Sequence, residues 1–259
     1  MLRAILFDLG DTLIDFEPMD TRAVFRTGAA STYEFLQARG HALPPFNIYC
    51  RRQFWAVRWA YLYAKLRRRE FNGLNLLESF CASIGIHLDR TALLDLAWLW
   101  YAPLTDHSGA EEDLSTTLTD LTRAGFKLGL VSNTFVAGSI HDRHLDLHGL
   151  LEPLPVRVYS SDVGYRKPDP RIFQTALDRL GVGAAETLFV GDLVKTDIVG
   201  ARRMGMKTAL KQPWGTTRSR GMADFVIEKL SDLPEVLTRL QPVAETREMK
   251  ASAFATAGV

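Results

Sequence analysis

Short apolar runs alternate with amphipathic segments through the second half of the chain, and one such run also opens it. The runs predict strands buried on both faces at residues 4–7, 127–132, 155–159 and 187–191, followed by shorter ones at 207–210 and 225–227. The amphipathic segments between and after them predict helices at 111–124, 139–148, 170–180, 197–204 and 233–240. Strands that alternate with helices in this way predict an α/β fold, a doubly wound, Rossmann-like parallel sheet.

Residues 17–105 lack this alternation and are rich in aromatic and helix-forming residues. Their pattern predicts four helices, at 22–39, 46–69, 74–84 and 90–101. We therefore expect a core formed by residues 1–16 and 106–241, with an inserted all-helical cap at 17–105. Residues 242–259 are small, polar and without periodicity, which is typical of a disordered tail.

The helix predicted at 46–69 combines aromatic and basic side chains. Trp55, Trp59, Leu62 and Leu66 recur at helical spacing and predict one apolar stripe. Basic residues interleaved with aromatics can bind nucleic acid or a bulky anion. We favour a helix whose aromatics pack the cap while its basic residues face water, because the whole chain has a formal charge of only +1. The basic residues are Arg51, Arg52, Arg58, Lys65, Arg67, Arg68 and Arg69.

Polar side chains mark the ends of several predicted strands. Asp8 follows the first strand, Ser132 ends the second and Asp192 follows the fourth, while Lys167 lies in the loop after the third. Each residue alone is more often a turn, a helix cap or a surface lysine. In a parallel sheet, however, all of these positions lie at the carboxyl edge, where ligands bind. We therefore expect them to form one pocket.

The residue types at this edge suit phosphoryl chemistry. Two acids from different strands can hold a hard cation such as Mg²⁺ through oxygen ligands. A hydroxyl and an ammonium group suit the free oxygens of a phosphoryl group, and the ammonium stabilises charge in the transition state. A carboxylate can also attack phosphorus and form an acyl phosphate, which water then hydrolyses.

Four segments, in this order, resemble the motifs of the haloacid dehalogenase-like hydrolase superfamily. They are residues 7–13 (FDLGDTL), 131–133 (VSN), 164–170 (GYRKPDP) and 191–197 (GDLVKTD). The helical insert after the first motif resembles the family's subclass I cap. The resemblance implies Asp8 as nucleophile and Mg²⁺ ligand, Asp192 as a second ligand, and Asp197 as a supporting acid. It also implies phosphate binding by Ser132, Asn133 and Lys167.

The first motif departs from the family's pattern at one position. Phosphatases of the family usually carry their second catalytic Asp two residues after the nucleophile, where this chain has Gly10. The backbone carbonyl of Gly10 can still bind Mg²⁺, since that contact needs no side chain. Asp11 follows one residue later, and either serves as the acid/base or caps the turn. The acid/base contributes about 10²–10⁴-fold to such reactions.

The leading interpretation is a Mg²⁺-dependent phosphatase that cleaves a small phosphorylated metabolite through an aspartyl-phosphate intermediate. Dehalogenation of a small 2-halo acid is an alternative known in this superfamily. That chemistry needs no metal, so Asp192 and the segment around Lys167 favour the phosphatase. A non-catalytic or weakly active binding protein of the same fold is a third hypothesis, which Gly10 supports.

Composition limits the partners and the compartment. The near-neutral charge argues against nucleic acid, and no run approaches the ~18 apolar residues of a membrane helix. The two cysteines, Cys50 and Cys81, form no disulfide framework or zinc spacing, which favours a reducing compartment. We expect a cytoplasmic monomer or homodimer without a membrane partner.

Three histidines, His141, His144 and His148, recur along one predicted helix at i, i+3 and i+7. A metal site would need further ligands, and the sequence shows no acidic partner for them. We expect these histidines to form a partly exposed helix face.

Overall fold

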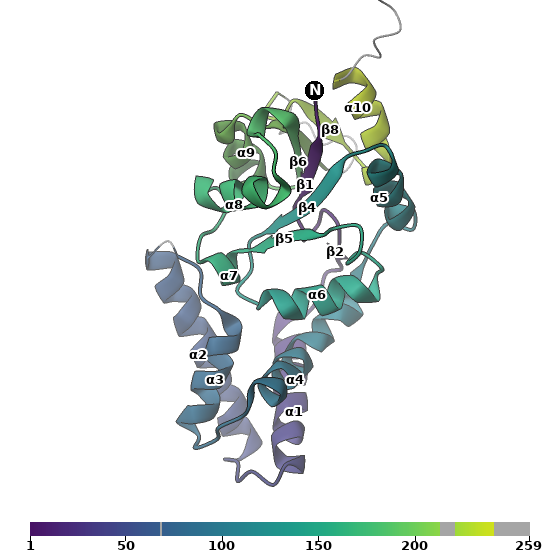
Figure 1. Ribbon diagram of the computed structural model, residues 1–259. Coiled ribbons are helices and arrows are strands. Elements are labelled where there is room, and N and C mark those ends of the chain that lie inside the picture. The colour runs from purple at the N-terminus through teal and green to yellow at the C-terminus, as the bar shows by residue number, and fades with distance from the viewer. Residues whose placement is uncertain (68, 213–220, 241–259) are drawn as a thin grey trace, which may run out of the picture.

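The computed structural model describes residues 1–67, 69–212 and 221–240. Within these residues, six parallel strands form the central sheet in the order β5-β4-β1-β6-β7-β8 (Figure 1). The strands are β1 (Ala4–Phe7), β4 (Lys127–Ser132), β5 (Val156–Tyr159), β6 (Thr187–Gly191), β7 (Lys207–Lys211) and β8 (Phe225–Ile227). This arrangement confirms the doubly wound α/β fold predicted from the sequence. The predicted tail at 242–259 lies outside the described residues.

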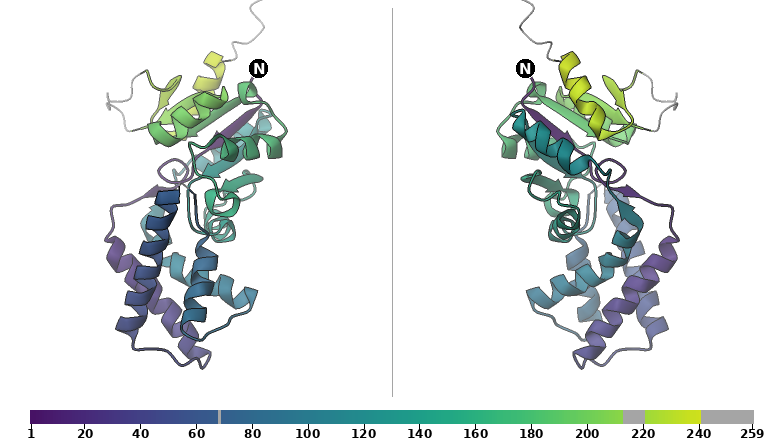
Figure 2. Two further views of the ribbon diagram at one scale, coloured as in Figure 1. Left: turned by 90° about the vertical axis from the view of Figure 1, so that its left-hand side faces the viewer. Right: turned by 90° about the vertical axis from the view of Figure 1, so that its right-hand side faces the viewer.

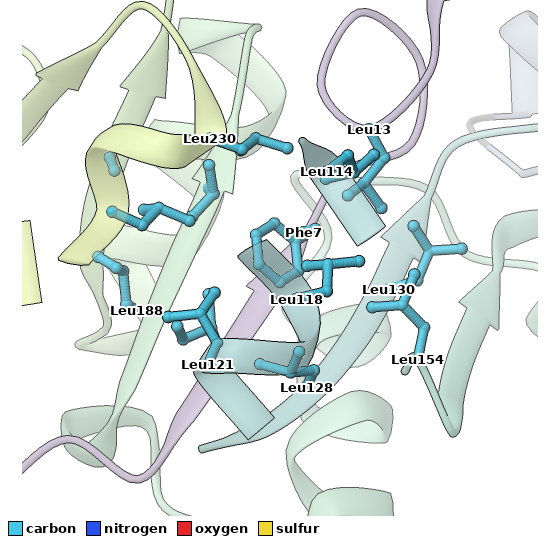
Figure 3. Packing of buried hydrophobic residues seen from close by; sticks show 14 of the residues in the cluster. Phe7, Leu13, Leu114, Leu118, Leu121, Leu128, Leu130, Leu154, Leu188 and Leu230 are labelled. Carbon is cyan, nitrogen blue, oxygen red and sulfur yellow. The ribbon is translucent and has the colours of Figure 1, made fainter. Parts of the chain in front are cut away.

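Strand β1 lies at the centre of the sheet because it pairs with β4 on one side and with β6 on the other. All of its side chains are buried, in alternation on the two faces. Ile5 and Phe7 join one hydrophobic cluster, whereas Ala4 and Leu6 join the other. Figure 3 shows Phe7 in the first cluster, among leucines from several elements. Burial on both faces explains why the sequence shows a continuous apolar run here.

Helices cover both faces of the sheet (Figure 2). Leucines of α5 (Leu114–Arg123) and α10 (Leu233–Leu240) pack in the cluster of Phe7. Apolar residues of α8 (Pro170–Leu180) and α9 (Val199–Met204) pack in the cluster of Leu6. Helix α8 has clear boundaries, since the Asp169 side chain accepts a hydrogen bond from the Arg171 amide at its start and Gly181 ends it at a φ of 63°. The helices of the core are α5 (Leu114–Arg123), α6 (Gly138–Leu147), α7 (Ser160–Val163), α8 (Pro170–Leu180), α9 (Val199–Met204) and α10 (Leu233–Leu240).

The insert forms a helical lobe beyond the carboxyl edge of the sheet (Figures 1 and 2). A separate hydrophobic cluster, which includes Leu36, Tyr49, Phe80 and Leu96, holds it together. The helices of the lobe are α1 (Thr21–Ala38), α2 (Phe46–Arg67), α3 (Gly73–Ser83) and α4 (Arg90–Tyr101), close to the predicted ranges. No helix in the described part of the chain is both long and apolar enough to cross a membrane.

Two short strands, which the sequence did not predict, join the lobe to the core. Strand β2 (Asp15–Phe16) enters the lobe and pairs antiparallel with β3 (Ser108–Gly109), which leaves it. The buried Lys211 of β7 contacts this junction, with its ammonium 3.1 Å from Asp15 and 3.0 Å from Glu111. It also donates a hydrogen bond to the Thr12 carbonyl. Lys211 therefore connects this junction to the sheet.

The predicted packing of the α2 stripe is wrong. Trp55, Trp59, Leu62 and Leu66 are all exposed, and Leu66 keeps 82% of its surface. The residues that α2 buries are Tyr49, Gln53 and Ala64. The tryptophan stripe begins two positions after Gln53, which is about 200° around a helix, so it faces nearly away from the lobe. Its spacing predicted a stripe but not the direction in which that stripe points.

Candidate active site

Asp8 and Lys167 meet in a buried ion pair at the carboxyl edge of the sheet. Asp8 follows β1 directly, and its amide donates a hydrogen bond to the Val190 carbonyl of β6. The Lys167 ammonium lies 2.5 Å from one carboxylate oxygen of Asp8 and 2.9 Å from one of Asp197. The Lys167 side chain is 1% exposed. One cation from a loop therefore contacts two acids from different parts of the sequence.

Asp197 is a buried acid beside Lys167. It is fully buried in a single π-helical turn (Val194–Ile198), and its carboxylate accepts a hydrogen bond from the Leu193 amide. A Cβ atom at Gly191 would lie 2.7 Å from the Asp197 side chain. Position 191 therefore needs glycine so that Asp197 can pack against the end of β6.

Asp8, Asp192 and Asp197 form a cluster of acids. One carboxylate oxygen from each lies within 4.8 Å of the others. Burial raises the pKa of Asp8, and burial, followed by the charges of Asp8 and Asp197, raises the pKa of Asp192 to about 7. Ionisation of all three carboxyl groups is therefore unfavourable unless a cation lies beside them.

The cluster fits a divalent cation. Oδ1 of Asp192 is buried and accepts no hydrogen bond from the residues that the structure describes. All three acids offer oxygen ligands, which hard cations prefer. Lys167 supplies one positive charge against three acids. Burial disfavours its ammonium form, but the facing carboxylates of Asp8 and Asp197 outweigh this effect and raise the pKa of Lys167. The cluster can therefore hold a metal ion beside a charged lysine.

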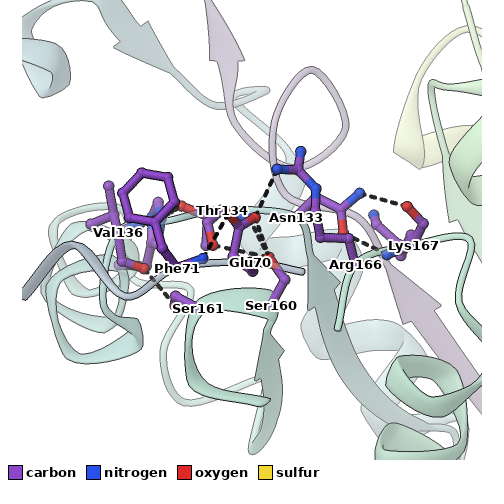
Figure 4. Close-up of polar contacts among 10 residues, drawn as sticks. Glu70, Phe71, Asn133, Thr134, Val136, Ser160, Ser161, Arg166 and Lys167 are labelled. Atoms are coloured by element: carbon purple, nitrogen blue, oxygen red, sulfur yellow. Dashed lines mark hydrogen bonds and ion pairs between the residues drawn. The ribbon is translucent and has the colours of Figure 1, made fainter. Parts of the chain in front are cut away.

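Ser132 and Asn133 lie next to this cluster. The register pairs Phe7 with Leu130, so Ser132 lies one position beyond Asp8 on the neighbouring strand. The Asn133 side chain accepts a hydrogen bond from the Lys167 amide and donates one to the Lys167 carbonyl (Figure 4). The Asn133 side chain therefore fixes the backbone of Lys167, a role that the sequence did not indicate.

Asp11 is held in the loop after β1 rather than in the acid cluster. It is exposed and has a φ of 54°, a left-handed conformation that Asp tolerates better than most residues. Its carboxylate accepts a hydrogen bond from the Phe16 amide at 3.3 Å. Its charge is a minor cause of the raised pKa of Asp192, after burial and the nearer acids. In this conformation Asp11 caps its own loop, one of the two options that the sequence left open.

Glu70 is a site residue that the sequence analysis missed. It comes from the lobe, between α2 and α3, and its side chain is 1% exposed. Its carboxylate lies 3.0 Å from the Arg166 guanidinium and accepts a hydrogen bond from the Ser160 hydroxyl (Figure 4). Glu70 therefore joins the lobe to the loop that carries Lys167. It follows three arginines, a setting typical of a solvated surface segment, so no local signal indicated its burial.

The expectation of a partly exposed histidine face is wrong for His141 and His144, which are both buried. Tyr101, at the end of α4, covers them, and its hydroxyl lies 2.9 Å from Nδ1 of His144. Nε2 of His141 lies 2.8 Å from the Thr134 hydroxyl. Burial lowers the pKa of His141 to about 3 and that of His144 to about 4, so both are neutral near pH 7. They join the lobe to the segment after β4.

An apolar cavity of about 360 Å³ lies between the lobe and the core, beside Ser132 and Asn133. The loop after β1 contributes Leu9 and Gly10 to its wall. The cavity therefore adjoins the polar site, and we call it the interlobe cavity.

The fold and the site define an α/β protein with a carboxylate cluster and a buried lysine at the carboxyl edge of its sheet. The family model of haloacid dehalogenase-like hydrolases matches residues 2–205. The chain belongs to this family.

Similar proteins with curated names include phosphatases. Glyceraldehyde 3-phosphate phosphatase from Methanothermobacter thermautotrophicus is 32% identical over 130 residues, which are 48% of this chain and 56% of that protein. N-acylneuraminate-9-phosphatase from Rattus norvegicus is 24% identical over 249 residues, which are 91% of this chain and 94% of that protein. The match therefore spans little more than half the length of the archaeal relative.

Solved structures of the same fold include both a phosphatase and a dehalogenase. A HAD phosphatase from Thermococcus onnurineus has a TM-score of 0.56 and 26% identity, with 91% of this chain and 98% of that chain covered. A 2-haloacid dehalogenase from Pseudomonas syringae has a TM-score of 0.59 and 25% identity, with 93% and 100% covered. Overall shape therefore does not separate the two reactions, and the site residues must do so.

Proposed function

We propose that this protein is a Mg²⁺-dependent phosphatase that cleaves a small phosphomonoester through an aspartyl-phosphate intermediate. The observation that carries the proposal is the buried Lys167, which contacts Asp8 within a cluster of three acids. A cluster with excess negative charge suits a divalent cation, and the same lysine suits a phosphoryl oxygen. The phosphatase names of two similar proteins agree with this reading.

In the proposed reaction, a carboxylate oxygen of Asp8 attacks phosphorus while the bond from phosphorus to the leaving oxygen breaks. The electron pair of that bond goes to the leaving oxygen, which takes a proton. Water then attacks the acyl phosphate, which releases inorganic phosphate and restores Asp8. The Ser132 hydroxyl, the Asn133 backbone amide and the Lys167 ammonium would bind the phosphoryl oxygens.

The cation would be held by Asp8, Asp192 and the backbone carbonyl of Gly10, with Asp197 in support. When bound, it would offset the repulsion between the nucleophile and the anionic substrate. The hydrogen bonds that close the loop after β1 use the Leu9 and Ile14 carbonyls as acceptors. A role of the Gly10 carbonyl as ligand is compatible with this pattern.

The direct test is phosphate release from p-nitrophenyl phosphate and acetyl phosphate, with the protein freed of metal by EDTA and then supplied with Mg²⁺. We expect turnover with Mg²⁺ and a loss of at least about a hundredfold without it. Two substrates are needed because acetyl phosphate is small and makes few contacts outside the phosphate site. If folded protein with Mg²⁺ bound hydrolysed neither substrate, the proposal would be overturned and a binding role favoured.

We further propose Asp11 as the acid/base, which requires it to leave the Phe16 amide during turnover. The Asp11→Asn variant keeps an oxygen acceptor for that amide but cannot transfer a proton. In single turnovers we expect the rate of leaving-group release to fall by about 10²-fold or more for an alkyl phosphate but less than about fivefold for p-nitrophenyl phosphate, whose leaving group needs little protonation. Rapid-quench kinetics with both substrates measures this first step separately from the later attack of water. An equal loss for both would instead assign Asp11 the structural role of a loop cap.

Dehalogenation is the second candidate, because the interlobe cavity is apolar and a 2-haloacid dehalogenase shares the fold. Halide release from 2-chloropropionate in the presence of EDTA would support it. The cluster of Asp8, Asp192 and Asp197 favours the phosphatase, since a metal-independent reaction gains nothing from three converging acids.

A further inference from the structure

We propose that the leaving group of the substrate is apolar, such as an aromatic or branched aliphatic alcohol, and that the interlobe cavity binds it. This inference rests on the proposed phosphatase function and goes beyond it, because the relatives described above are named for glyceraldehyde 3-phosphate and for an N-acylneuraminate phosphate, which are both polar.

The position of the cavity identifies its occupant as the leaving group. Ser132 and Asn133 lie in its wall, as do Leu9 and Gly10, the two residues that follow the nucleophile Asp8. A phosphoryl group bound at Ser132 and Lys167 therefore has this cavity beside it. The remainder of the substrate has to extend from the phosphorus into a neighbouring space, and this cavity adjoins the site.

The side chains that line the cavity are predominantly apolar. The lobe contributes Met19, Val24, Phe25, Trp100 and Leu104, and the core contributes Phe16, Phe135 and Val136. Asp, Glu, Lys and Arg are absent from the described residues that line it. A second phosphate group or a carboxylate in this cavity would therefore lack a cationic partner, which is costly.

Several polar side chains of the wall already have partners within the protein, whereas the buried indole N–H of Trp100 has none among the described residues. The Tyr101 hydroxyl contacts Nδ1 of His144, and the Thr134 hydroxyl contacts Nε2 of His141. The Asn133 side chain is bonded to the Lys167 backbone. A sugar would bury several hydroxyl groups here, where few groups are free to bond them, and each unpaired hydroxyl is unfavourable. An apolar group has no such requirement.

The volume also suits a ring-sized group. An engineered cavity of about 150 Å³ lined by Leu, Ile and Phe binds benzene. The interlobe cavity, at about 360 Å³, has room for one or two rings beside the phosphate. Phe25, Trp100 and Phe135 provide aromatic surfaces against which such a ring can pack, in the edge-to-face or offset arrangements that aromatic pairs prefer.

The test compares benzyl phosphate with glycerol 3-phosphate, both esters of primary alcohols, so that leaving-group basicity differs little. We expect kcat/KM to be at least about tenfold higher for benzyl phosphate, because only its leaving group gains from apolar burial. Acetyl phosphate reports the phosphate site alone. Equal or higher kcat/KM for glycerol 3-phosphate would overturn this inference, while acetyl phosphate turnover that needs Asp8 would leave the phosphatase proposal standing. Absence of turnover with all three would overturn both.

A substitution in the cavity wall tests whether the cavity is responsible for the selectivity. Val24→Trp adds bulk to a half-buried position of the cavity wall, and Ala23→Trp adds the same side chain at the exposed neighbour. For Val24→Trp we expect the ratio of kcat/KM for benzyl phosphate to that for acetyl phosphate to fall at least about tenfold. For Ala23→Trp the ratio should stay at the wild-type value. An unchanged ratio in Val24→Trp, with both variants folded by circular dichroism, would show that the leaving group binds elsewhere.

Discussion

Replacing Asp8 with asparagine should lower kcat for p-nitrophenyl phosphate by at least about a thousandfold. Asparagine has nearly the same shape, and its carbonyl oxygen can still accept a hydrogen bond from Lys167. It cannot supply the anionic oxygen that the proposed attack on phosphorus requires. Steady-state phosphate release at saturating Mg²⁺ measures the effect. This is the largest loss of activity that we expect from any single conservative substitution in the chain.

The Asp8→Asn variant should remain folded. Burial raises the pKa of Asp8, so the folded protein already stabilises the charged carboxylate poorly, and a neutral amide removes a buried charge. Asp106→Asn, at an exposed acid of the segment between lobe and core, is the matched control and should keep wild-type activity. Residual turnover above about a tenth of wild type, with the variant's identity confirmed by mass spectrometry, would exclude Asp8 as the nucleophile.

The strand-end positions of the site could be predicted because each is encoded locally. An apolar run such as residues 4–7 specifies a buried strand, and parallel strands place their carboxyl ends at one edge. The structure brings Asp8, Lys167 and Asp192 to that edge, and Ser132 to the adjacent strand end. No knowledge of the lobe was needed for this part of the prediction.

What could not be predicted depends on contacts between segments distant in sequence. Glu70 is buried because a segment nearly a hundred residues later supplies Arg166 and Ser160 as partners. His144 is buried because Tyr101 lies over it. The outward direction of the tryptophan stripe follows from which side of α2 meets the other helices of the lobe. Periodicity gives the faces of a helix but not its neighbours.

The position of Asp11 illustrates a different limit. The sequence places an acid one residue beyond the family's usual position, and a turn can direct such a side chain either way. The backbone at Asp11 is left-handed, and its carboxylate meets the Phe16 amide where the chain enters β2. That amide belongs to the junction with the lobe.

Replacing Lys167 with methionine should lower kcat for p-nitrophenyl phosphate by about 10²–10³-fold and should make the stability of the protein more dependent on Mg²⁺. The ammonium contacts Asp8 and Asp197, so its loss removes both a phosphate ligand and the positive charge that offsets the cluster. Methionine fills a similar volume without charge. Asp8 and Asp192, whose pKa values burial already raises, should then hold their negative charge still less readily near neutral pH.

A divalent cation would replace the lost charge, so the increase in Tm on addition of Mg²⁺ should be larger for Lys167→Met than for wild type. Lys195→Met, at an exposed lysine of the neighbouring turn, controls for the loss of a surface charge and should behave as wild type in both assays. Differential scanning fluorimetry with and without Mg²⁺ measures the shift, and Ca²⁺ tests how selective the cluster is. An equal Mg²⁺ shift in Lys167→Met and wild type, together with lost activity, would place the cation away from the carboxylates that Lys167 contacts. The lysine would then act on the phosphate alone.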